Sequence, residues 1–148
     1  AGTMVENGGQ VTGVITRYLY EKEVAFSDLD DLRIVETMHE RKALMAELCD
    51  GFIALPGGFG TMEEIFEALT WSQLNLHQKP CGFLNICGYY DALISFVDHM
   101  IDQGFVKDDC RQLVTEGHSP AQIIDQFKTY RHFTVDKAGW ALNTVSSN

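Results

Sequence analysis

A glycine-rich turn that leads into an acidic helix start is the part of this sequence best suited to chemistry. The turn, Pro56 to Gly60, follows an apolar run at 51–55 and precedes a helix-like segment that carries Glu63 and Glu64. Glycines let a backbone bend sharply and come close to a ligand, and the N–H groups at the start of a helix suit a phosphate. The alternative is a simple tight turn, but a strand, this turn and a following acid together favour chemistry on a phosphorylated small molecule.

An arginine on the apolar face of a predicted helix is the second candidate. The helix is expected at 40–49, and Arg41 lies on its apolar face because of 3- and 4-residue spacing. It shares this face with Leu44, Met45 and Leu48. A guanidinium turned inward needs an anion. Two interpretations are equally good: a bidentate clamp on a phosphate or catalytic carboxylate, or a structural ion pair. Lys42 lies off this face, and the pattern alone indicates a solvated side chain.

The position of Glu64 on its own helix is less clear from periodicity. The helix is expected at 61–76, with an apolar face made by Met62, Ile65, Phe66, Leu69 and Gln73. Glu64 falls on the opposite side, so periodicity alone favours a solvated carboxylate. Trp71 and Leu74 on that side indicate instead that the second face is covered, as a subunit interface would do.

Composition and charge exclude several classes of protein. The 148 residues, 45% hydrophobic and 22% charged, indicate one soluble globular domain, and the net charge of −10 argues against a nucleic-acid or anionic-membrane binder. No apolar run approaches the roughly 20 residues of a membrane span, and no secretory signal is visible. The four cysteines form no CxxC pair and are expected to be reduced core residues of a cytoplasmic protein. The five histidines lack metal-ligand spacing, so we expect no metal site.

Strand-like and helix-like runs alternate along the chain, which favours an α/β fold with a largely parallel sheet. Strands are expected at 10–16, 33–36, 51–55, 81–86 and 113–116. Helices are expected at 40–49, 61–76, 90–103 and 121–130, with Pro120 in the first turn of the last. Residues 1–7 look like the end of a helix. The sequence therefore places the glycine turn between a strand and a helix of such a fold.

Two motifs closely resemble the LOG family, the cytokinin riboside 5′-monophosphate phosphoribohydrolases, whose members are often mislabelled lysine decarboxylases. The family pattern is an M-x-x-R-K helix followed by PGGxGTxxE. Here the first reads Met38 to Lys42 and the second reads Pro56 to Glu64. The later segments at 70–74, 79–80 and 88–90 also look like the family. The resemblance runs from Ala1 to about residue 130.

The resemblance implies a Rossmann-like three-layer α/β protein that hydrolyses the N-glycosidic bond of a nucleoside 5′-monophosphate such as AMP or isopentenyl-adenosine monophosphate. By position, Arg41 and Glu64 match the catalytic pair. The substrate- and phosphate-binding positions are Met38, Lys42, Gly57, Gly58, Gly60 and Thr61. A carboxylate can stabilise the positive charge that builds on the ribose ring, and Arg41 can keep that carboxylate ionised or hold the phosphate. No metal or redox cofactor is implied, and family members are homodimers or larger.

The chain departs from the family at its beginning. Members normally start with a strand, a helix and a second strand that ends in a GGGxxGLMG-type loop, whereas this chain enters partway through the next helix. We therefore expect an N-terminally truncated fold, with a single domain at 1–130 and a tail at 131–148 that is extended, disordered or packed on a neighbouring subunit. Two alternatives follow: a non-catalytic module that binds a nucleotide or phosphate, and a chain that mainly oligomerises.

Overall fold

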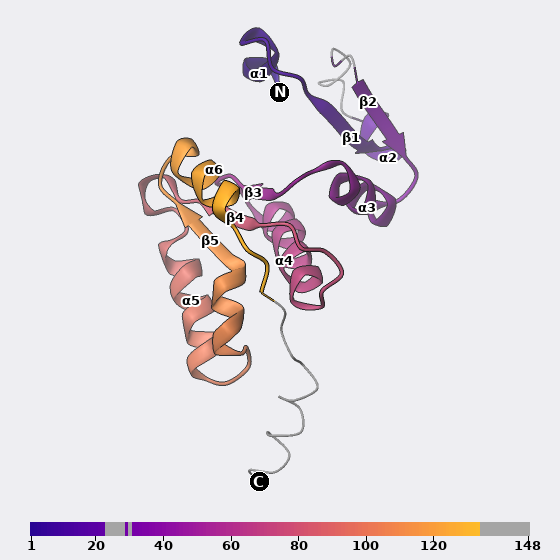
Figure 1. The fold of residues 1–148 in the computed structure, drawn as a ribbon. Helices are drawn as coiled ribbons and strands as arrows, with labels where there is room; N and C mark the ends of the chain where they lie inside the picture. The colour runs from indigo at the N-terminus through magenta and orange to yellow at the C-terminus, as the bar shows by residue number, and fades with distance from the viewer. Residues whose placement is uncertain (23–28, 30, 134–148) are drawn as a thin grey trace. The chain divides into compact units, whose positions relative to one another are not determined.

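The structure is a computed structural model that describes residues 1–22, 29 and 31–133. The chain divides into two compact units, Ala1–Cys49 and Asp50–Asn148 (Figure 1). Each unit is a separate arrangement of helices and parallel strands, and each carries one of the two sequence motifs.

The first unit is a pair of parallel strands with short helices around it. Its elements are α1 (Gly2–Glu6), β1 (Thr12–Thr16), α2 (Arg17–Tyr20), β2 (Asp31–Val35) and α3 (Met38–Leu48). Thr12 lies opposite Asp31, and this register continues to the ends of both strands. A capping box starts α3: Glu40 N donates to Thr37 Oγ1 at 3.1 Å, and Thr37 N donates to Glu40 Oε2 at 3.3 Å. This cap fixes where the helix carrying Arg41 begins.

The second unit is a three-stranded parallel sheet in the order β3-β4-β5. Its elements are β3 (Phe52–Ala54), α4 (Phe59–Gln73), β4 (Cys81–Leu84), the 3₁₀ helix η2 (Ile86–Gly88), α5 (Asp91–Asp102), the 3₁₀ helix η3 (Asp108–Leu113), β5 (Val114–Gly117) and α6 (Pro120–Thr129). Ser119 caps α6 by accepting a hydrogen bond from Gln122 N, and Pro120 stands in its first turn. Consecutive strands are thus joined through helices, as parallel pairing requires.

The middle strand β4 is buried along its whole length and separates two layers of helices. Cys81 and Phe83 pack with residues of α4 and α5 in the main core. Because side chains alternate along a strand, Gly82 faces the other side, where a Cβ would lie 2.8 Å from Ile123 Cδ1 of α6. The second unit is therefore a three-layer α/β arrangement, with α4 and α5 on one face and α6 on the other.

The α/β prediction with parallel strands is confirmed, and the expected strands and helices are all present with ends that differ by a few residues. The helix α2 was not expected. The cysteine prediction holds in part: Cys81 and Cys110 are buried, Cys49 is half-buried, and Cys87 is exposed. Among the described residues, every helix is too short or too polar to span a bilayer. The single domain at 1–130 stays a prediction, and residues 134–148 of the expected tail lie outside the described part.

Candidate functional site

Three connections of the second unit lie at one edge of its sheet. Because β3, β4 and β5 are parallel, their carboxyl ends point the same way. The glycine turn follows β3, Asn85 follows β4, and His118 follows β5. In open α/β sheets, ligands bind outside the carboxyl ends of the strands. This edge is therefore the candidate ligand site of the second unit.

The glycine turn ends at the N-terminus of α4. Gly58 is the N-cap and Met62 N donates to Gly58 O at 3.1 Å, so Gly60 and Thr61 belong to the first helical turn. No glycine of this turn has a positive φ, so left-handed backbone, one reason for a turn to need glycine, is absent here. Instead the glycines provide space, since a Cβ at Gly58 or Gly60 would meet no atom within 4 Å. The start of α4 is thus open to a ligand.

Gly57 differs from the other two glycines because Thr61 packs against it. A Cβ at Gly57 would collide with Thr61 Oγ1 and lie 3.0 Å from Thr61 Cβ. We expect Gly57→Ala to lower the free energy of unfolding by about 1–3 kcal/mol through this overlap. Chemical denaturation measures this loss. The loss should be smaller when Gly57→Ala is introduced into a protein that already carries Thr61→Ala, because the overlapping side chain is then shorter. Gly60→Ala is the control and should be neutral or stabilising by up to about 1 kcal/mol. Equal losses at Gly57 and Gly60 would contradict the contact.

Glu64 is half-buried on α4, a little over one turn from the cap. Its partial exposure lies between the solvated carboxylate that periodicity alone favours and a fully covered face, because the side that it shares with Ala68 and Trp71 is partly covered within the chain. Ala68 is only 3% exposed, and His77 Nε2 lies 2.9 Å from Ala68 O. Burial lowers the pKa of His77, which favours a neutral imidazole against this helix. Periodicity predicted the side of the helix on which Glu64 lies, but not which residues cover that side.

Arg41, Lys42 and Met38 all lie on α3 in the first unit. Arg41 and Lys42 are half-buried, and Met38, the first residue of the helix, is exposed. Arg41 Nε donates to Val14 O of β1 at 3.0 Å, which uses one of the five N–H donors of the guanidinium. This bond ties α3 to the strand pair and turns the guanidinium toward β1, although no residue of α3 is buried and Leu48 of the expected apolar face is exposed.

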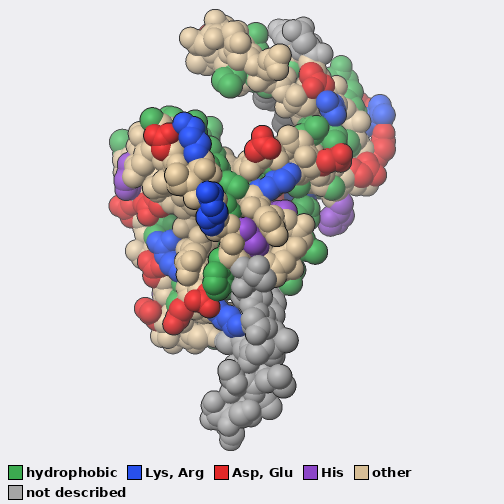
Figure 2. All heavy atoms as spheres, in the orientation of Figure 1, with side chains coloured by type: hydrophobic (Ala, Val, Ile, Leu, Met, Phe, Trp, Pro, Cys, Tyr) green, Lys and Arg blue, Asp and Glu red, His purple; other side chains and the backbone are tan. Residues whose placement is uncertain are grey.

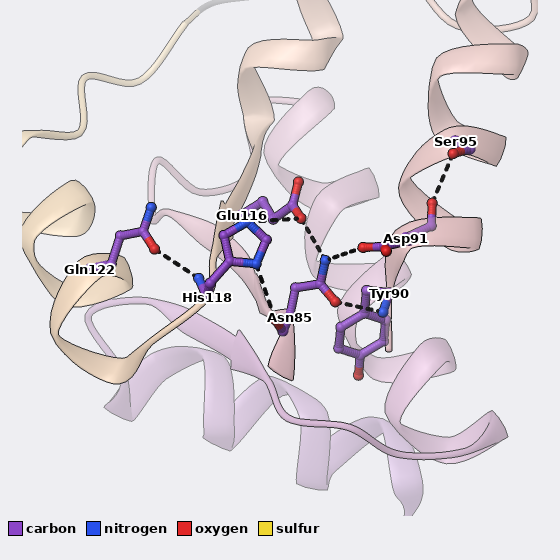
Figure 3. A network of polar contacts seen from close by, with 7 residues as sticks. All are labelled: Asn85, Tyr90, Asp91, Ser95, Glu116, His118 and Gln122. Carbon is purple, nitrogen blue, oxygen red and sulfur yellow. Dashed lines mark hydrogen bonds and ion pairs between the residues drawn. The ribbon is translucent and has the colours of Figure 1, made fainter. Parts of the chain in front are cut away.

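The structure also shows a polar cluster that the sequence motifs did not predict, centred on Asn85 (Figure 3). Asn85 is 1% exposed. Its Nδ2 donates to Asp91 Oδ1 at 2.7 Å and to Glu116 Oε1 at 2.6 Å, and its Oδ1 accepts from Tyr90 N at 2.8 Å. The amide therefore joins the ends of β4 and β5 to the start of α5. The sequence signal that could have indicated this cluster is a polar residue, Asn85, directly after the fully apolar strand β4.

Two tyrosines extend this cluster to the glycine turn. Tyr89 Oη donates to Gly57 O at 2.8 Å, and Tyr90 Oη donates to Leu55 O at 2.5 Å. Both residues follow η2, in which Cys87 has a φ of 53°. The connection after β4 thus contacts the connection after β3 through side chains.

Two further features are the distribution of charged side chains and the grouping of possible metal ligands. On the face shown in Figure 2, Lys and Arg side chains are interspersed with Asp and Glu rather than gathered into one basic patch. In the part of the chain that the structure describes, no three His, Cys, Asp or Glu side chains are grouped so that they could hold a metal ion.

Comparison with known proteins defines the family. A family model described as "possible lysine decarboxylase" matches residues 1–127. Cytokinin riboside 5′-monophosphate phosphoribohydrolase LOG1 of Arabidopsis thaliana is 40% identical over 145 residues, which are 95% of this chain and 68% of that protein. The chain belongs to the LOG family. The resemblance seen in the motifs is thereby confirmed.

Other LOG-family members match over a smaller share of their length. Probable cytokinin riboside 5′-monophosphate phosphoribohydrolase LOGL1 of Oryza sativa subsp. japonica is 45% identical over 130 residues, 88% of this chain and 58% of that protein. The rice LOG protein is 42% identical over 127 residues, 85% of this chain and 52% of that protein. The chain thus spans a little over half the length of these curated relatives. Its two LOG motifs lie at the start of α3 and across the β3–α4 connection.

Proposed function

We propose that this chain belongs to an enzyme that hydrolyses the N-glycosidic bond of a nucleoside 5′-monophosphate, giving a free base and ribose 5-phosphate. The observation that carries the proposal is the start of α4, where open space over Gly58 and Gly60 adjoins a half-buried Glu64 on the same helix. The relatives described above are named for this reaction on cytokinin riboside 5′-monophosphates, which supports the same reaction here.

The 5′-phosphate is proposed to bind at the glycine turn. The first backbone N–H groups of α4, from Gly58 to Thr61, and the positive end of the helix dipole favour an anion there. Gly57 supports the turn by its contact with Thr61. Lys42 and Met38, on α3 of the other unit, are also proposed as substrate-binding residues from their places in the family motif. Binding the phosphate at the helix start would hold the ribose near the next turn, where Glu64 lies.

Glu64 and Arg41 are proposed as the catalytic pair. As the bond from C1′ to the base nitrogen breaks, positive charge develops on the ribose ring, and a carboxylate stabilises it or orients the attacking water. The water oxygen bonds to C1′ and loses a proton, while the base leaves and takes up a proton. The role of Arg41, which lies in the other unit, is proposed from its place in the family motif: a guanidinium can hold a phosphate or keep a carboxylate ionised. The residues supply this chemistry as charge and hydrogen bonds.

A homodimer or larger assembly in the cytoplasm is part of the proposal. Exposed apolar side chains at and after the end of α4, Leu74 and Leu76, support a surface that a second copy covers. Sedimentation of the purified chain at several concentrations measures this, and a monomer throughout would contradict it.

The direct test is to incubate the purified chain with AMP, with isopentenyl-adenosine monophosphate and with adenosine, and to follow free base by chromatography. We expect base from the monophosphates and none from adenosine, because the phosphate holds the substrate. Saturable nucleotide binding without base release would favour the binding module, and neither binding nor release would favour a chain that only oligomerises. The relative rates for the two monophosphates identify the preferred base.

A further inference from the structure

The glycine turn is held from outside by hydroxyl groups rather than by its own side chains. Most of the turn and the residue before it are open to solvent: Leu55, Pro56 and Gly58 are exposed, and Phe59 is 97% exposed. The carbonyl of Leu55, directly before the turn, accepts a hydrogen bond from Tyr90, and the carbonyl of Gly57 accepts one from Tyr89. Because the turn buries so little of itself, these two bonds are a large part of what fixes its conformation.

The two tyrosines are themselves fixed, but in different ways. Tyr90 is 1% exposed and packs edge-on against Phe83, with ring centroids 5.0 Å apart. Its backbone N–H is held by Asn85 (Figure 3). Burial, and secondarily Tyr89, raise the pKa of the Tyr90 phenol, so the hydroxyl keeps the proton that it donates. Tyr89 is 54% exposed and stacks edge-on against Tyr90 at 4.9 Å. Removing the Tyr89 hydroxyl therefore disturbs little besides the bond to Gly57.

The bond from Tyr89 sets the direction of one backbone N–H. A peptide group is planar and trans, so its C=O and the following N–H point in opposite directions. Holding Gly57 O toward Tyr89 therefore turns Gly58 N–H away from Tyr89. Glycine on both sides makes rotation of this peptide sterically easy, and a rotated peptide would present a carbonyl oxygen in place of an N–H. The Tyr90 bond has no such effect, because Leu55 O belongs to the peptide of Pro56, which has no N–H.

We propose that Tyr89 is a positioning residue that locks the Gly57–Gly58 peptide so that Gly58 N–H faces a bound phosphate. This inference deepens the proposed function and rests on it for the identity of the ligand. Tyr89 acts through the backbone of the turn and does not itself have to touch the substrate. Tyr90, by contrast, stabilises the connection between β3 and α4 through Leu55 O, but it orients no backbone N–H group.

The test compares Tyr89→Phe with Tyr90→Phe in the full chain. For Tyr89→Phe we expect the dissociation constants of AMP and of inorganic phosphate to rise about three- to tenfold, the worth of one hydrogen bond. Adenosine binding and the thermal midpoint should stay close to those of the unchanged protein. Tyr90→Phe should do the reverse, lowering the thermal midpoint and changing phosphate affinity less. Calorimetry and thermal denaturation give these values.

Hydrogen exchange of the ligand-free protein provides a second measurement that needs no nucleotide. In Tyr89→Phe, the amides from Gly58 to Thr61 should exchange faster, while those of β4 should not. Two outcomes would overturn the role of Tyr89 without touching the proposed hydrolase. One is unchanged amide exchange in the turn of Tyr89→Phe. The other is an AMP affinity of Tyr89→Phe equal to that of the unchanged protein, when the unchanged protein does release base. Absence of base release with intact nucleotide binding would overturn the proposed hydrolase and leave the Tyr89 comparison valid.

Discussion

Glu64→Gln should reduce turnover of a nucleoside 5′-monophosphate by about 10²–10⁴-fold, the range typical of a lost catalytic carboxylate. The amide has the same shape but cannot stabilise the positive charge on the ribose ring or accept a proton from water. Nucleotide affinity should change much less, because the phosphate is proposed to bind at the turn and not at this side chain. Single-turnover kinetics and calorimetry on the same preparation separate the two effects.

Glu63→Gln is the matched control for this prediction. Glu63 is the neighbouring residue on α4 and is exposed, whereas Glu64 is half-buried on a different side of the helix. The two substitutions change net charge and helix-start electrostatics by the same amount. If both lowered turnover equally, the carboxylates would act only through charge at the start of α4. Full activity in Glu64→Gln would contradict the catalytic assignment.

Sequence periodicity predicted the elements of this fold well because each has a strong local cause. β4 is a short apolar run before a polar residue, and α5 has its apolar residues at helical spacing. The sequence pattern predicts that α4 starts at Thr61, whereas the helix begins at Phe59. Glycine disfavours helix, so a pattern that contains Gly60 does not look helical. In the structure, packing of the whole helix against the sheet overrides that preference.

The candidate site was predictable only in part. Motif residues such as Gly57 and Glu64 could be named, since their order along the chain carries the signal. The contacts that shape the turn could not: Tyr89 reaches Gly57 over 32 positions of sequence, and Asn85 reaches Glu116 over 31. Such pairs depend on which strands are neighbours and on how the connections after them meet. Local patterns do not contain that information.

Asn85→Asp should destabilise the second unit by on the order of 3 kcal/mol, because it removes the donor to two carboxylates and places a new charge on a buried side chain. Asn85 Nδ2 now lies 2.7 Å from Asp91 Oδ1 and 2.6 Å from Glu116 Oε1. Replacing this NH₂ group by a carboxylate oxygen would put a third negative charge, on an almost fully buried side chain, beside the half-buried Glu116 and the exposed Asp91. Chemical denaturation at neutral pH measures the loss.

A second substitution tests whether the lost Nδ2 donor and the added negative charge cause the loss of stability in Asn85→Asp. Adding Glu116→Gln to Asn85→Asp exchanges the two groups, so that the glutamine amide can donate to the new carboxylate and one negative charge is removed. We expect roughly half of the lost stability to return, since Asp91 still faces a carboxylate. A control, Ser95→Ala, removes the nearby bond from Ser95 Oγ to Asp91 O at the surface of α5 and should cost well under 1 kcal/mol. No recovery in the double variant would mean that the shape of Asn85, and not its hydrogen bonds, holds the ends of β4 and β5 together.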